Sequence, residues 1–317
     1  MTAEGMLPVN AQGTLAGMLG TASKKSKNAT GEKVMLIETA IGDAMGLGFE
    51  YVPQEITELY NDLSAYRAHP KHPLLPGQYS DDTQMSIGTA EAVLAIRGGA
   101  TPSRELFTHH YLQAFWRDVR PGYAQRFYDF LLTVGSVEDF LARIKPTSEK
   151  SGAAMRAGPL GVFEDPHQVK YLAELQASLT HDTPLGRAAA VAAALMTNYF
   201  LYDRGPRSKL GTYLDHKVPI ESWRWQDERA EKVGAAGWQS VAAAVSAIQR
   251  FDSLSDCLRW VVGLRGDVDT AAAICMAAAS CSREIHQDLP AHLYTGLENG
   301  NFGRDYLLEL DHKLGLT

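Results

Sequence analysis

The sequence of 317 residues lacks the features that mark secreted and membrane-spanning proteins. Its three cysteines, Cys257, Cys275 and Cys281, form no CxxC pair, and an odd number is typical of reduced, buried thiols. No segment approaches the roughly 20 apolar residues of a membrane span. The N-terminus has no basic start followed by a continuous apolar stretch, so it does not resemble a signal peptide. We therefore expect a cytoplasmic protein without membrane contact.

A basic excess is also absent, since 30 Lys and Arg residues stand against 37 Asp and Glu residues. The net charge of -7 argues against a protein that binds the nucleic-acid backbone. It is compatible with a cation site, although a mild acidic excess commonly serves only solubility.

Alternation of apolar and polar residues with a period of two, the mark of half-buried strands, is nearly absent. Helical spacing occurs instead, as at Val34, Ile37, Ile41 and Met45. We interpret residues 54–79 and 203–234 as loops. Helices are expected at about 32–46, 83–97, 103–116, one or two within 121–145, 163–178, 185–199, 238–248, 254–262 and 269–285. This pattern predicts an all-α protein with ten or more helices in a compact bundle.

Residues 1–31 differ from the rest, because they are polar, small or basic with scattered apolar side chains. We predict an N-terminal extension here, followed by one catalytic domain over residues 32–317. Two alternatives stay open for the extension. It is either a flexible tail or an arm that becomes ordered on a partner.

Two clusters of acidic residues follow glycine and precede predicted helices. Ser and Asp are ordinary helix caps, so capping alone is one explanation. Adjacent carboxylates, however, repel each other unless a cation lies between them. Divalent ions such as Mg²⁺ and Mn²⁺ prefer oxygen ligands, and the absence of a nearby His or Cys argues against zinc. The candidates for two such ions are Ser80, Asp81, Asp82, Asp267, Asp269 and Thr270.

Five short segments occur in the order that characterises one enzyme family. They are Ile41–Gly46 with Glu50 behind it, Tyr79–Gln84, Ser151–Pro159, Thr180-His181 and Gly266–Thr270. On these segments the chain resembles the ADP-ribosylglycohydrolases over about residues 33–285. That family consists of all-α enzymes with a binuclear magnesium or manganese site.

The resemblance implies roles for individual residues. The six candidates named above would hold the metals, with serine at position 80 where the family more often has threonine. Glu50 would lie at the metal edge. Three carboxylates are candidates to move protons: Asp82, Glu50 and Asp118, although Asp118 could instead be a surface partner of Arg117 or Arg120. The wall against the diphosphate and ribose would include Gly152, Ala153, Met155, Arg156 and Gly158, and His181 would contact the ligand unless it is a cap or core histidine.

The activity implied is hydrolysis of the glycosidic bond between ADP-ribose and a protein side chain, in particular an arginine guanidinium. The partner would be an ADP-ribosylated protein. The alternative is an immunity protein that binds an ADP-ribosyltransferase toxin through residues 1–31, with or without hydrolysis. An inactive relative is a third possibility, which the intact set of acidic residues disfavours.

Overall fold

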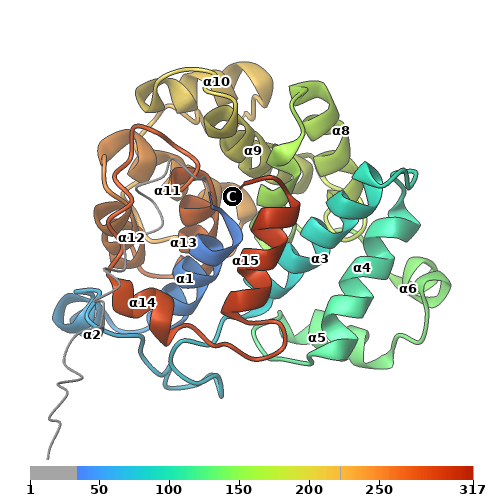
Figure 1. Ribbon diagram of the computed structural model, residues 1–317, viewed down its shortest axis with the longest axis horizontal. Helices are drawn as coiled ribbons and strands as arrows, with labels where there is room; N and C mark the ends of the chain where they lie inside the picture. Colours follow the sequence, from blue (N-terminus) through green and yellow to red (C-terminus); the bar gives the residue numbers. More distant parts are fainter. Residues whose placement is uncertain (1–33, 222, 317) are drawn as a thin grey trace, which may run out of the picture.

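The computed structural model describes residues 34–221 and 223–316. Within these ranges it contains fifteen α-helices and two 3₁₀-helices, with isolated β-bridges and no strand (Figure 1). The predicted all-α class is therefore confirmed. None of the helices in these ranges has the length and apolar composition needed to cross a membrane. The predicted N-terminal extension, residues 1–31, lies outside the described residues.

The elements follow one another along the chain, with longer connections at residues 61–80 and 218–236. In order they are α1 (Leu36–Leu47), α2 (Gln54–Tyr60), α3 (Asp81–Arg97), α4 (Arg104–Arg117), α5 (Gln125–Thr133), α6 (Val137–Arg143), α7 (Gly152–Met155), η2 (Gly158–Val162), α8 (Pro166–Ala177), α9 (Pro184–Leu201), η3 (Arg207–Lys209), α10 (Leu210–Lys217), α11 (Gly237–Arg250), α12 (Leu254–Gly263), α13 (Val268–Ala279), α14 (Ala291–Gly296) and α15 (Arg304–Lys313).

Helices α1 and α13 form the centre of the bundle, because every residue of both helices is buried. Glycine permits their close approach. A Cβ atom on Gly42 would lie 2.6 Å from the carbonyl oxygen of Ala272, and one on Gly46 would lie 2.4 Å from Cα of Asp269. Gly46 comes after Gly42 in α1, whereas Asp269 comes before Ala272 in α13, so the two helices run in opposite directions. The end of α1 lies beside the start of α13, where the second acidic cluster is.

The far end of the chain fixes the start of α1. The carboxylate of Asp311, on α15, accepts hydrogen bonds from the backbone N–H groups of Met35 (3.3 Å) and Leu36 (3.0 Å). These donors have no partner within their own helix, so a buried carboxylate satisfies them in place of a local cap. In Figure 1, α15 lies beside α1.

Most predicted helices are confirmed, but two predicted loops contain helices. Residues 54–79 include α2, which presents Ile56, Leu59 and Tyr60 to solvent and therefore lacks the usual apolar period. Residues 203–234 include η3 and α10, which is held by buried Leu210 and Leu214. Two apolar residues four positions apart are too few to indicate a helix in a polar segment. Helices α14 and α15 are not predicted from the sequence.

Candidate functional site

A tightly held loop positions the second acidic cluster. Gly266 has a φ of +89°, and a Cβ atom there would lie 1.8 Å from the carbonyl oxygen of Val233, so glycine is required. The N–H of Val233 donates to Arg265 O (3.0 Å), and the N–H of Asp267 donates to Val233 O (3.1 Å). These bonds direct the chain into α13 with Asp267 just before the helix and Asp269 in its first turn.

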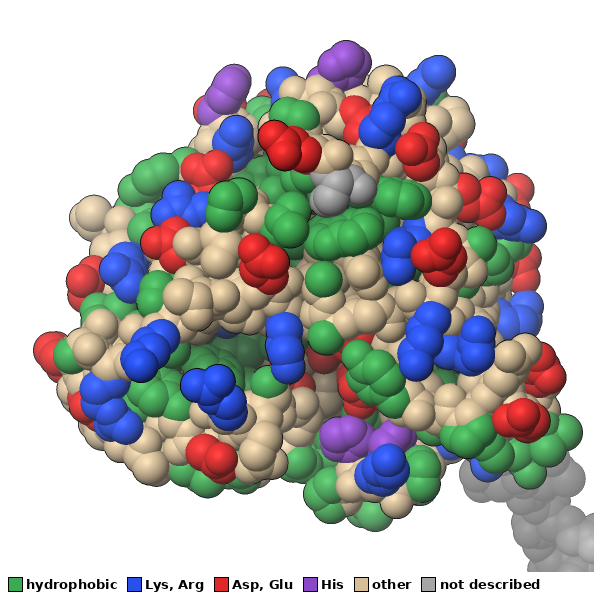
Figure 2. Space-filling model, turned by 180° about the vertical axis from the view of Figure 1, so that it is seen from behind, with side chains coloured by type: hydrophobic (Ala, Val, Ile, Leu, Met, Phe, Trp, Pro, Cys, Tyr) green, Lys and Arg blue, Asp and Glu red, His purple; other side chains and the backbone are tan. Residues whose placement is uncertain are grey.

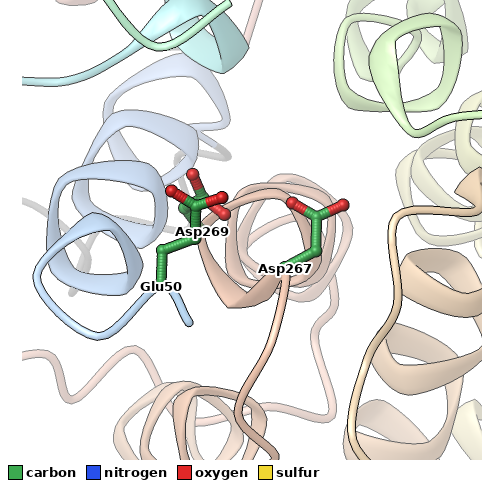
Figure 3. Close-up of side chains that lie close together, drawn as sticks. All are labelled: Glu50, Asp267 and Asp269. Atoms are coloured by element: carbon green, nitrogen blue, oxygen red, sulfur yellow. The ribbon is translucent and has the colours of Figure 1, made fainter. Parts of the chain in front are cut away.

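Glu50 reaches the same place from the turn after α1. The N–H of the next residue, Tyr51, donates to Gly266 O (3.0 Å) and ties this turn to the loop before α13. Carboxylate oxygens of Glu50, Asp267 and Asp269 all lie within 4.8 Å of one another. Figure 3 shows the carboxylates of Glu50 and Asp269 side by side, with Asp267 next to them. Acidic side chains lie recessed in a hollow of the surface near histidine side chains (Figure 2).

Two histidines of the loop at 61–79 hold Glu50. Nδ1 of His69 accepts from the N–H groups of Lys71 and His72, both at 3.0 Å, so its Nε2–H donates to Glu50 O (2.8 Å). Burial lowers the pKa of His69, in agreement with a neutral ring. The turn built in this way places His72 Nε2 at 3.0 Å from Glu50 Oε2.

The first acidic cluster is attached to α1 through Asp43. Its carboxylate accepts from the N–H (3.0 Å) and hydroxyl (2.8 Å) of Ser80 and from the N–H (3.0 Å) and hydroxyl (2.6 Å) of Thr83. Ser80 is also the N-cap of α3, since its side chain accepts from Asp82 N–H. Four charge-assisted bonds thus fix the start of α3, and with it Asp81 and Asp82, to the side of α1.

The carboxylates of the two clusters influence one another electrostatically. Burial and neighbouring carboxylates raise the pKa values of Asp81, Asp82 and Asp269 well above the ordinary value. Asp267 has its pKa raised to about 6, by burial and by Glu50. The acidic residues on α1, α3 and α13, which lie far apart in the sequence, are therefore close enough in the fold to influence one another.

Individual oxygen atoms of this site have no hydrogen-bond partner within residues 34–221 and 223–316. Among the described residues these include Oδ1 of Asp82 and Oδ1 of Asp269, both buried. A buried, unpaired carboxylate oxygen is costly, and a bound divalent cation would remove both this cost and the mutual repulsion. The atoms that could bind a metal here are all oxygens, which are the ligands that Mg²⁺ and Mn²⁺ prefer. The residues therefore fit such a cation, with Glu50, Asp267 and Asp269 as the compact acidic group.

Asp118 is engaged in an ion pair with Arg120, one of the alternatives that the sequence left open. Arg120 also donates to Tyr79 O (2.7 Å) and to Glu298 Oε1 (2.6 Å). This network holds the loop after α4, in which Gly122 lies against Asp81: a Cβ atom on Gly122 would be 2.5 Å from Asp81 Oδ1. The geometry gives Asp118 a structural task, and its catalytic role stays a prediction.

The small-residue segment 151–161, which we predict to line the ligand site, forms α7 and η2. Ser151 hydrogen-bonds the side chain of Asp267, which connects α7 to the acidic site. Gly152 is half-buried and lies beside His181. The other predicted ligand contacts of this segment are buried: Ala153, Met155, Arg156 and Gly158.

Four residues of this site were not recognised as functional from the sequence. Asp43 had a usable signal, because it is the single ionisable residue in the otherwise apolar end of a predicted helix. His69 and His72 lie in a segment without periodicity, about 20 residues from the Glu50 they hold. Ser151 looked only like the start of a glycine-rich stretch.

Comparisons with known proteins give a consistent result. Residues 30–316 match the family model described as ADP-ribosylglycohydrolase. An uncharacterized protein of Archaeoglobus fulgidus is 25% identical over 300 residues, which cover 88% of this chain and 94% of that protein. The ADP-ribosylarginine hydrolase Tri1 of Serratia proteamaculans is 24% identical over 272 residues, or 78% and 70% of the two chains.

A solved structure titled ADP-ribosylglycohydrolase-related protein complex has the same fold. It gives a TM-score of 0.67 at 22% sequence identity, over 89% of this chain and 94% of its own.

Proposed function

This chain belongs to the ADP-ribosylglycohydrolase family, and we propose that it is a metal-dependent hydrolase that removes ADP-ribose from modified arginine side chains of proteins. The observation that carries the proposal is the convergence of Glu50, Asp267 and Asp269 into one acidic group. The arginine acceptor is supported by the name of the relative from Serratia proteamaculans.

The residues that would hold two cations come from the starts of two helices. They are Ser80, Asp81, Asp82, Asp267, Asp269 and Thr270, with Glu50 at their edge. When bound, Mg²⁺ or Mn²⁺ supplies orientation of the ribose hydroxyls and stabilisation of charge near C1. The hydroxyl of Ser80 donates to Asp43 and accepts from the N–H of Asp82, which leaves one lone pair of its oxygen for a cation.

The chain's own carboxylates would move protons. Hydrolysis requires one proton to leave the attacking water and one to reach the leaving nitrogen. Glu50 is our candidate to accept the proton from water, because its carboxylate is partly exposed and oriented by His72. Asp82 is our candidate to donate, because its buried carboxylate lies at the start of α3 beside the residues that would hold the cations.

On the other side of the site, Gly152 and His181 would contact the ADP-ribosyl group. The missing side chain of Gly152 leaves room next to the imidazole ring. The half-buried start of α7 lies next to the acidic group through the bond between Ser151 and Asp267. A ligand held by its ribose at the acidic group would therefore extend past α7.

The test is release of ADP-ribose from an arginine-modified protein in the presence of Mg²⁺. Replacing Asp81 or Asp269 with alanine should reduce release by at least about 100-fold, as expected when a transition-state interaction of 2.7 kcal/mol or more is lost. Asp227→Ala, at an exposed position, is the matched control and should retain activity. Full activity in both site variants would refute the assignment. Release only from serine-modified protein would refute the arginine acceptor.

A further inference from the structure

A chain of polar side chains runs through the interior behind α7. The guanidinium of Arg156, 2% exposed, donates from Nε to Gln176 Oε1 (2.7 Å) and from one terminal nitrogen to Thr180 Oγ1 (3.0 Å). Thr180 Oγ1 lies 2.7 Å from Nδ1 of His181. The guanidinium also stacks on Tyr111, 4.4 Å from its ring centre. Arg156 therefore uses its donors inside the protein.

The proton positions along this chain follow from its first donor. Arg156 can only donate, so Thr180 Oγ1 accepts from it. The remaining acceptor for the hydroxyl proton of Thr180 among its recorded contacts is Nδ1 of His181. The imidazole is neutral, since burial and Arg156 lower the pKa of His181 to about 3. A neutral ring that accepts at Nδ1 carries its hydrogen on Nε2.

Nε2 of His181 is buried and has no hydrogen-bond partner among the described residues. It lies at the edge of the space that Gly152 leaves open. A Cβ atom placed on Gly152 would be 3.1 Å from Cε1 and 3.4 Å from Nε2 of His181, and no other residue described beyond its chain neighbours comes within 4 Å. The missing side chain of Gly152 therefore leaves a side of Nε2 open, from which an oxygen atom of a ligand could approach to hydrogen-bonding distance.

We infer that Arg156 and Thr180 are positioning residues, which fix His181 as a neutral imidazole whose Nε2–H donates to an acceptor oxygen of the bound ADP-ribosyl group. This inference rests on the proposed function for the identity of the ligand. It changes the role of Arg156 from a direct substrate contact to a residue that acts through Thr180. The unsatisfied donor, costly in the free protein, is then a preformed contribution to binding.

The tautomer can be measured in the free protein by ¹⁵N NMR of the imidazole rings, with the His181 signals assigned by their loss in His181→Gln. We expect a pyrrole-like Nε2 and a pyridine-like Nδ1 in the wild type and in Thr180→Ser, which keeps the hydroxyl. Thr180→Val should lose this preference. It should bind ADP-ribose roughly three- to tenfold more weakly, while Thr180→Ser binds like the wild type.

Gly152→Ala provides a second variant, which fills the space beside Nε2 without touching Thr180. It should keep the wild-type tautomer and weaken ADP-ribose binding. A proton on Nδ1 in the wild type would overturn the inference, as would unchanged ADP-ribose affinity in Thr180→Val. If the tautomer and the ADP-ribose affinities are as expected but no modified protein is hydrolysed, the proposed function fails and this inference stands. If the wild type does not bind ADP-ribose, this inference is wrong, because His181 then has no ADP-ribosyl group to which it could donate.

Discussion

Gly46 of α1 lies so close to Asp269 of α13 that a Cβ atom on the glycine would be 2.4 Å from Cα of the aspartate. The same atom would be 2.7 Å from the backbone nitrogen of Asp269. These are backbone atoms, which cannot rotate away as the tip of a side chain would. The position of an acidic residue in the site is therefore set by the absence of a methyl group on the neighbouring helix.

Gly46→Ala should separate the ends of α1 and α13. We expect a loss of unfolding free energy of about 1–3 kcal/mol, typical of overpacking, together with weaker Mn²⁺ binding. Urea unfolding and Mn²⁺ titration would measure the two effects. Gly135→Ala is the control, because a Cβ atom there would meet nothing within 4 Å, and it should change stability by about 0.5 kcal/mol or less. Equal stability of the two variants would contradict the packing argument.

Asp43→Asn should disconnect α3 from α1. The amide keeps one acceptor oxygen but directs N–H groups at the donors of Ser80 and Thr83, which now bond to a carboxylate. We expect the free energy of unfolding to fall by about 1–3 kcal/mol. The free energy of Mn²⁺ binding should fall by more than this, because Asp81 and Asp82 follow Ser80 directly.

The matched control for this variant is Asp227→Asn at an exposed position. It makes the same chemical change without removing contacts at the site. Retention of wild-type Mn²⁺ affinity by Asp43→Asn would show that the start of α3 is fixed by other means.

Glu38→Gln should make stability less dependent on pH. Burial, with a contribution from Asp311, raises the pKa of Glu38 from its ordinary 4.5 to about 8. The folded protein therefore retains a proton that the unfolded chain releases. Its stabilising contribution is complete below about pH 4.5 and is lost as the pH rises towards 8. Glutamine stays neutral throughout this range.

The measurement is urea unfolding of metal-free protein at about pH 5 and about pH 8.5. Wild type should lose more stability between these values than Glu38→Gln. Some pH dependence remains in the variant, because burial raises the pKa of Asp311 to about 7. Glu55→Gln, at an exposed position, should behave like the wild type. Identical pH dependence in wild type and Glu38→Gln would contradict the account of this buried carboxyl.

Some of this arrangement could be predicted from the sequence. Helical spacing of apolar residues indicates the all-α class, which the structure confirms. The acidic cluster before α13 points to residues that do converge with Glu50, whereas a metal site shared with the first cluster stays a prediction. The order of five short segments along the chain indicates the ADP-ribosylglycohydrolase family, which the family model confirms. These features are local, so they are visible without knowledge of the fold.

Other features depend on contacts between distant segments. The contacts of His69 and His72 with Glu50 depend on how the loop at 61–79 folds, and that loop has no periodicity from which its path could be predicted. The carboxylate of Asp311 caps the start of α1 from 275 residues away in the sequence. Arg156 was expected to contact substrate, but its surroundings are Gln176 and Thr180 in the interior. A positive charge beside a glycine-rich segment does not indicate whether it faces a ligand or the core.

The central claim is that the acidic residues of α3 and α13, with Glu50, form one site for divalent cations. Its most direct test is a Mn²⁺ titration followed by the electron paramagnetic resonance signal of the free ion. We predict that the wild type and Asp227→Asn bind two Mn²⁺ ions and that Asp269→Asn loses affinity by at least about tenfold. Wild-type Mn²⁺ binding by Asp269→Asn would contradict the claim.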